Sequence, residues 1–498
     1  MMRPTTTPAP TPTAPPADVA RVAGRGTLFI SAAKLWFIVS GFGIHFTLPR
    51  LMSEDQFGLY QVVIGIVSII NAVVVTGTSQ TVSKYISQDE GRADSVKAKA
   101  LRLQAAVGGA LTLGFVLLAP LVASYLNDAR LTNYLRLAAL ITLSYSFYAV
   151  FTGYFNGQRK FLTQAALDAT YSTLKLACVV VMVWAGFGVA GGVAGFALAA
   201  AGVLGLSALV AGRGRRTGDV RIKELFTFQS YLLAFTLVLN LLQKVDLILV
   251  KALSSPDAEL ASANAGFYGA ALNVANITYQ VIIAVTFVVF PLVSQATFAD
   301  DRARTRAYVA NTVRYTLMIM ALLATLFSAN AAAVLRVVYP DPYQAGSGAL
   351  AFVAFGMLAF GLIYVLTTII SASGRPTVSL MIGIVTLVAS AALNALLIPR
   401  LGLTGAGLAT TLAMFAGAGV GGAYLLTKFG ALIPPLSLAR IVACSAAVYA
   451  LSLAYAPASK VLIVAKLAVL GLLYVVALIV SREVGRDELR LIRRVVQK

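Results

Sequence analysis

The sequence predicts an all-α polytopic membrane protein with about fourteen transmembrane helices, arranged as two six-helix bundles and two further C-terminal helices. Composition is the first reason. Hydrophobic residues make up 59% of the chain and charged residues only 12%, which is too few charges to cover the surface of a soluble protein of this size. Long apolar runs are the second reason. Residues 346–371 and 376–399 carry no charged residue and exceed the roughly 18 residues that cross a bilayer.

An internal repeat is the third reason. The sequence NGQR at 156–159 corresponds to SGR at 373–375, and FGLY at 57–60 corresponds to AGFY at 265–268. All these matches lie roughly two hundred residues apart, so the repeat covers half the chain rather than a short motif. Two similar helical halves in one membrane chain are typical of transporters that bind their substrate between the halves.

The first half begins with a tail rich in proline, threonine and alanine at residues 1–24. Such a segment has too few apolar residues to build a core, and we expect a disordered cytoplasmic tail. Residues 25–212 then form the predicted N-terminal six-helix bundle. Its helices are expected at about 27–49, 57–82, 101–126, 131–155, 162–186 and 189–212.

The second half follows a basic cytoplasmic linker at residues 213–223. Residues 224–428 form the predicted C-terminal six-helix bundle, residues 429–481 the two extra helices, and residues 482–498 a basic cytoplasmic tail. The predicted helices lie at about 224–252, 266–291, 307–333, 346–371, 376–399, 403–427, 437–456 and 460–481.

Basic residues gather in alternate connections between these helices. They lie at 84–102, 159–160, 213–223 and 302–306 and in the tail at 482–498, whereas the intervening connections hold one or two at most. Lysine and arginine accumulate on the cytoplasmic side of membrane helices, so we expect both termini in the cytoplasm. The net charge of +20 is therefore a sign of membrane topology and not of nucleic-acid binding, for which the chain has no basic folded module.

No stretch of the sequence carries the residues of an enzyme. There is a single histidine, no paired carboxylates in a large loop, no phosphate-binding loop and no cysteine and histidine spacing for a metal. We therefore expect no catalysis, no cofactor and no metal. Without an ATP site, any energy must come from an ion gradient, the membrane potential or a substrate gradient.

Polar side chains inside the apolar spans are the candidate functional residues, because charge is costly there and tends to face a cavity or a partner. His45 follows Lys34 by eleven residues on the first helix, about three whole turns, so both point the same way. On the seventh helix Asn240 shares a face with Lys244 and Lys251, and Asp246 lies on the neighbouring face. A polar stripe on the eighth helix completes the set: Asn273, Asn276 and Gln280.

Each charged candidate also fits a structural role. Lys34 lies near one end of its helix and can extend its ammonium to the lipid headgroups. His45 can be a packing histidine, and Lys244 or Asp246 can hold neighbouring helices together. On the fifth helix Asp168 and Lys175 are seven residues apart and can form a buried pair or line a cavity.

The segment around residues 394–410 carries a family resemblance. Asn394, Pro399, Gly402 and the run GAGLAT at 405–410 resemble the C-terminal half of bacterial polysaccharide (oligosaccharide-lipid) flippases. Their superfamily also holds the multidrug and toxin extrusion antiporters and the lipid II flippase. The resemblance implies a protein of the bacterial inner membrane that moves a polyprenyl-diphosphate-linked oligosaccharide from the cytoplasmic to the outer leaflet by alternating access. It also implies that the first, seventh and eighth helices line a cationic cavity for the diphosphate.

Other functions of the same superfamily stay open. A lipid II flippase is the first alternative, although the first helix lacks a dense arginine cluster. A cation-coupled multidrug antiporter is the second, although fourteen spans and a basic cavity are not typical of that group. The implied partners are the lipid-linked oligosaccharide and membrane lipid, with a coupling cation and a polysaccharide polymerase as further options.

Overall fold

The computed structural model describes residues 17–214, 221–298, 302–430, 432–457 and 459–485. Within these ranges every regular element is a helix, so the predicted all-α fold class is confirmed. Residues 1–16 of the predicted disordered tail, 215–220 of the basic linker and 486–498 of the basic tail lie outside the described residues.

The first half of the chain contains six long helices. The first of them begins at Ala17, whereas the sequence predicted a start near residue 27, so our assignment of residues 17–24 to a disordered tail is wrong. The segment follows a proline and is rich in alanine, with an aspartate in its first turn, and all three features favour the start of a helix. The helices are α1 (Ala17–Thr47), α2 (Glu54–Gln88), α3 (Ala93–Tyr125), α4 (Arg130–Gly157), α5 (Phe161–Met182) and α6 (Gly188–Ala211).

The second half begins with a broken helix. We predicted one helix over residues 224–252, but the structure has α7 (Ile222–Leu242) and α8 (Val245–Leu253), with Gln243 and Lys244 between them. Neither proline nor glycine marks this break, so the sequence contained no signal for it. The remaining helices are α9 (Ala258–Phe298), α10 (Arg302–Ala329), α11 (Ala331–Val338), α12 (Ser347–Ala372), α13 (Pro376–Phe429), α14 (Pro435–Leu453) and α15 (Lys460–Val480).

Ten helical segments in the described ranges are long and apolar enough to cross a membrane. Two of them, Phe161–Ala211 and Pro376–Phe429, contain 51 and 54 residues, more than twice the roughly 20 residues that one span needs. Each is interrupted by glycine in a left-handed conformation, Gly186 with φ 91° and Gly402 with φ 58°, which other residues rarely adopt. The count of fourteen spans stays a prediction.

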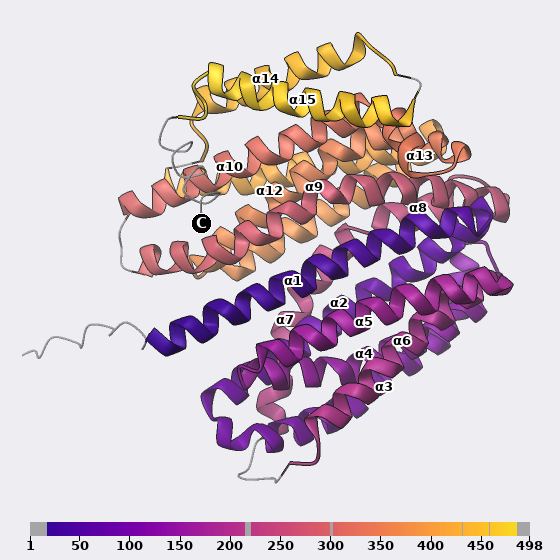
Figure 1. The fold of residues 1–498 in the computed structure, drawn as a ribbon, viewed down its shortest axis with the longest axis vertical. Helices are drawn as coiled ribbons and strands as arrows, with labels where there is room; N and C mark the ends of the chain where they lie inside the picture. Colours follow the sequence, from indigo (N-terminus) through magenta and orange to yellow (C-terminus); the bar gives the residue numbers. More distant parts are fainter. Residues whose placement is uncertain (1–16, 215–220, 299–301, 431, 458, 486–498) are drawn as a thin grey trace, which may run out of the picture.

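The helices run side by side in two groups (Figure 1). In the first group α2 packs against α4, α4 against α3 and α6, and α1 against α5. In the second group α12 packs against α9, α10 and α13, and α14 and α15 lie at the outer edge. The two groups meet where α2 packs against α9, and α7 contacts both α2 and α13. This seam between the halves is where a substrate site is expected in a repeated transporter.

The bundle has two ends, which we name after one residue at each. At the Asp128 end, the α3–α4 turn meets α8 through Asp128 and Lys251, whose Oδ2 and Nζ atoms are 2.9 Å apart. At the Asp94 end, the Tyr154 hydroxyl donates to Asp94 over 3.0 Å. Described residues of three basic connections meet at the Asp94 end, where Lys97 donates to the Gly212 carbonyl and Arg159 lies 4.0 Å from Glu90. The sequence therefore predicts that this end is cytoplasmic.

Candidate functional site

His45 lies near the C-terminal end of α1 and is half-buried. Its Nδ1 atom is buried and has no hydrogen-bond partner among the residues that the structure describes. The charges that act on its imidazole are those of Lys244 and Lys175. We group His45, Lys175 and Lys244, which come from α1, α5 and the α7–α8 junction, as the basic cluster, because both lysine charges act on the imidazole through space.

Lys175 is buried, with 9% of its surface exposed. Its ammonium lies 4.6 Å from the ring centre of Phe37, 5.3 Å from that of Phe196 and 5.5 Å from that of Tyr171. A cation over aromatic faces is attracted by the ring quadrupole, but this attraction does not neutralise its charge. In the described part of the chain no carboxylate lies within ion-pair distance of Lys175.

The buried pair that we considered between Asp168 and Lys175 does not form. Asp168 instead accepts a hydrogen bond of 2.6 Å from the Tyr148 hydroxyl, and the lysine that acts on it electrostatically is Lys34. Sequence reasoning therefore missed Lys175 as a member of the basic cluster. Because Lys175 is seven residues from Asp168 on the same helix, we interpreted the two as a possible ion pair and did not consider Lys175 as an unpaired cation.

Lys244 lies at the break between α7 and α8 and is half-buried. A side chain at Gly65 of α2 would come within 4.0 Å of the Lys244 Cδ atom, so the lysine lies against the first half of the chain. Within the described ranges its ammonium has no ion-pair partner, although Asp246 acts on it through space. The basic cluster therefore draws two residues from the first half and one from the second.

Asp246 is completely buried inside the second half. Its carboxylate accepts hydrogen bonds from the Tyr268 hydroxyl and the Leu247 amide, both over 2.8 Å, and from the Thr410 hydroxyl over 3.3 Å. Asn394 donates to the same Thr410 hydroxyl over 3.2 Å. These contacts tie α8 to α9 and α13, which favours the structural alternative for Asp246 over a cavity role.

The remaining candidates are dispersed. Asn240 donates to the Thr236 carbonyl of its own helix over 2.8 Å, and Asn273 donates to the Tyr339 hydroxyl over 3.5 Å. Asn276 and Gln280 are half-buried on α9. Lys34 is exposed on α1 and acts on Asp168, so it does not join His45 in the basic cluster as the helical spacing predicted.

The predicted common face of Asn240, Lys244 and Lys251 is also wrong. It assumed one continuous helix, and the break after Leu242 removes that assumption. Lys251 is buried at the Asp128 end and pairs with Asp128, whereas Lys244 belongs to the basic cluster.

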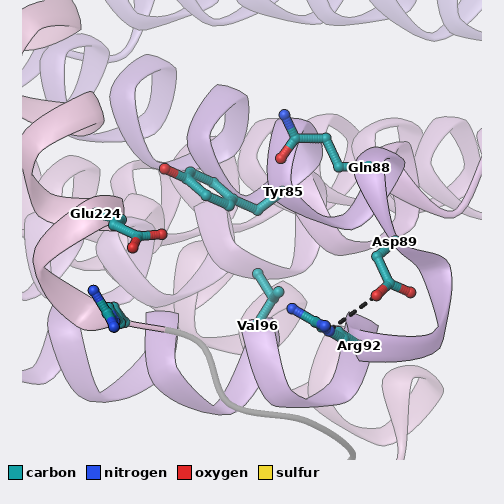
Figure 2. A pocket seen from close by; sticks show the side chains of 7 residues that line it. Tyr85, Gln88, Asp89, Arg92, Val96 and Glu224 are labelled. Atoms are coloured by element: carbon teal, nitrogen blue, oxygen red, sulfur yellow. Dashed lines mark ion pairs between the residues drawn. The ribbon is translucent and has the colours of Figure 1, made fainter.

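A small polar pocket lies at the Asp94 end, where the ends of α2, α3 and α7 meet (Figure 2). Its volume is about 300 Å³, and Arg92 and Asp89 at its rim form an ion pair of 2.9 Å. Its other lining residues are Tyr85, Gln88, Val96, Arg221 and Glu224. None of the candidate residues lines this pocket, so it is distinct from the basic cluster.

We compared the chain with known protein families, curated proteins and solved structures. A model of the polysaccharide biosynthesis protein family matches residues 47–347. No curated protein matches the chain.

Solved structures share its fold. The lipid II flippase MurJ in an inward closed conformation matches with a TM-score of 0.75 and 14% identity, over 92% of this chain and 100% of that one. An inward-facing multidrug resistance MATE transporter of the MOP superfamily matches with a TM-score of 0.67 and 14% identity, over 79% and 94% of the two chains. A MOP superfamily transporter from Pyrococcus furiosus, described by the reverse polarity of its binding pocket, matches with a TM-score of 0.61 and 15% identity over 82% and 96%.

Proposed function

This chain belongs to the polysaccharide biosynthesis protein family, and from that premise we propose that it flips a polyprenyl-diphosphate-linked oligosaccharide from the cytoplasmic to the outer leaflet of the bacterial inner membrane. The fold is that of membrane transporters of the MOP superfamily. The family and the fold do not specify the substrate, the direction of transport or the membrane, and these three points are our proposal.

The basic cluster is the observation that supports this substrate. Lys175 belongs to the first half of the chain and Lys244 to the second, and both act on His45 through space. In the described ranges neither lysine has a carboxylate partner. Charges away from bulk water are costly unless an opposite charge accompanies them. An anion of the substrate supplies that charge, and a diphosphate presents two negative groups to two lysines.

The position of the cluster suits a lipid-linked substrate. Sugar and diphosphate groups cannot enter hydrocarbon unaided, because their hydrogen bonds to water would be lost. A polar site at the seam between the halves replaces that water. The prenyl chain stays in the lipid, outside the protein, while the headgroup crosses.

Deleting the gene tests the proposal. We expect lipid-linked oligosaccharide to be synthesised in normal amounts and to remain on the cytoplasmic leaflet. Extraction measures the amount, and a membrane-impermeant glycosidase added to intact spheroplasts measures the exposed fraction. Loss of the lipid-linked oligosaccharide altogether would indicate a biosynthetic enzyme, and normal exposure to the glycosidase would show that another protein flips it.

A lipid II flippase is the second candidate, since MurJ covers 92% of this chain. In that case depletion would strand lipid II and cause lysis, while the polysaccharide would be lost only as a consequence. Viable cells that lack only the surface polysaccharide would exclude it. A multidrug antiporter is less compatible with the basic cluster, because two unpaired lysines repel cationic drugs.

A further inference from the structure

The Asp128 end holds a buried ion pair that joins the two halves of the chain. Asp128 lies in the α3–α4 turn of the first half, and Lys251 lies on α8 of the second half. The side chains are 2% and 0% exposed, and their Oδ2 and Nζ atoms are 2.9 Å apart. The ammonium also donates to the Ser262 hydroxyl over 2.6 Å and to the Ala258 carbonyl over 2.8 Å. All three of its donors are therefore satisfied.

The carboxylate of Asp128 is held in place by its own half. Arg130 donates to both of its oxygens over 3.0 Å, and the same guanidinium donates to Asp55 of α2 over 3.2 Å. Among the described residues of the second half, Lys251 and, at 3.4 Å, Ser262 are the ones that hydrogen-bond to it. Asp128 is thus an acceptor fixed in one half that receives the cation of the other.

The surrounding contacts close the seam at this end. A Cβ atom at Gly58 of α2 would overlap the Ser262 carbonyl of α9, so the two helix backbones touch. The rings of Phe57 and Tyr343 pack edge to face with centres 5.6 Å apart. The ion pair between the halves is almost completely buried within these contacts.

We propose that the Asp128–Lys251 ion pair is a latch that holds the two halves together at the Asp128 end and breaks whenever the seam opens there. A buried pair stabilises only the closed arrangement. In that arrangement the loss of Asp128 leaves the Lys251 ammonium without a carboxylate, and the loss of Lys251 leaves Asp128 with Arg130 of its own half and no cation from the other half. In the open arrangement water solvates the remaining charge. The latch rests on the relative movement of the halves that the proposed function requires, and it is independent of the substrate.

Distances between spin labels on the two halves test the latch in the full-length protein in lipid nanodiscs. The labels are placed on cysteines at Asn133 of α4 and Glu259 of α9, both exposed at the Asp128 end. Cys178 and Cys444 are replaced by alanine. In this background Lys251→Met and Asp128→Asn are each expected to raise the ratio of long to short distances at least about 10-fold.

The double variant tests whether the two charges act on the seam as a pair. Removing both charges leaves neither of them unpaired, so the shift of Lys251→Met with Asp128→Asn is smaller than the sum of the single shifts. Lys251→Arg keeps the charge and stays near the parent ratio. Asp55→Asn is the matched control, because it removes a carboxylate from the same network without a contact across the seam, and it leaves the ratio unchanged.

Three results would overturn the latch: unchanged ratios in both single variants, shifts that add in the double variant, or an equal shift in Asp55→Asn. Only the monodisperse fraction with parent-like circular dichroism is measured, so misfolding does not imitate opening. The distance ratios can behave as expected while the deletion strain still exposes its lipid-linked oligosaccharide on the outer leaflet. That result would support the latch and contradict the proposed substrate.

Discussion

At the scale of single residues, charge without a partner distinguishes the basic cluster from the other buried charges. Lys251 has Asp128, and Asp246 has three hydrogen-bond donors. Lys175 is buried against aromatic rings without a carboxylate in the described ranges. The first two are structural by this criterion, and the third is a residue that we propose binds the substrate anion.

Lys175→Gln and Lys244→Gln should therefore impair export, and Lys→Arg at each position should retain much of it. A charge-assisted bond to phosphate contributes about 1.5–3 kcal/mol, so each loss weakens binding ~10- to 100-fold. Export is measured as surface polysaccharide at matched protein levels. Lys460→Gln is the control, since Lys460 is an exposed lysine at the start of α15. Full export by the Lys175→Gln, Lys244→Gln double variant would contradict the proposal that these lysines bind the diphosphate of the substrate.

Asp128 stays ionised in its part of the latch across the physiological pH range. Burial by itself raises the pKa of Asp128, but hydrogen bonds and charge from Arg130 and Lys251 outweigh it and hold the pKa below the usual 3.8. A carboxyl whose pKa is lowered by folding contributes its full stabilisation above the unfolded pKa and loses it as the pH falls through the folded value. Label distances should stay constant from about pH 8 to about pH 5. Opening near pH 6 would show that a different group controls the seam.

At the scale of helices, α2 and α9 cross without side chains between them. Gly58 faces the Ser262 carbonyl, and a Cβ at Gly266 would lie 2.8 Å from the Glu54 carbonyl. Small residues at a crossing allow membrane helices to approach closely and gain dispersion contacts.

Gly58→Ala should force this crossing apart. We expect a loss of about 1–3 kcal/mol in stability, because the neighbour is backbone and cannot rotate away. Thermal unfolding in detergent measures it. Gly114→Ala on α3 is the matched control, because a Cβ there meets no atom within 4 Å, and alanine is the better helix former. Equal stability of the two variants would mean that the helices separate at little cost.

At the scale of the whole molecule, the two ends differ in charge. Described residues of the basic connections at 84–102 and 159–160 belong to the Asp94 end, and the latch belongs to the Asp128 end. If the positive-inside rule holds for this chain, the latch closes the seam on the outer side.

Topology reporters test this orientation. A fusion after Arg216 should report the cytoplasm, and a fusion near Ser255, in the α8–α9 connection, should report the outer side. Alkaline phosphatase and a fluorescent protein are complementary reporters for the two compartments. Both sites on one side would contradict a membrane crossing by α7 and α8, and inverted signals would place the latch in the cytoplasm.

The amino-acid sequence alone determined the fold class and most helices of this protein. Hydropathy and helix length are local properties, and a chain with 59% hydrophobic residues has few ways to bury its backbone polar groups other than membrane helices. The sequence predicted separate helices at 376–399 and 403–427, and α13 is interrupted between them at Gly402, whose φ of 58° glycine readily adopts. The predicted start of α1 was ten residues too late. The alanine-containing segment that begins the helix directly follows the low-complexity tail, and we assigned it to that tail.

Only the tertiary structure decided which side chains meet. Asp168 and Lys175 lie on one helix and do not pair, whereas Asp128 and Lys251 are 123 residues apart and form the latch. Lys244 lies against α2 near Gly65 and Lys251 pairs with Asp128, although no proline or glycine marks the helix break between α7 and α8. Helical periodicity gives the face on which a residue lies. It does not give the helix that covers that face, because the packing of apolar helices against one another depends on the summed shape of many side chains.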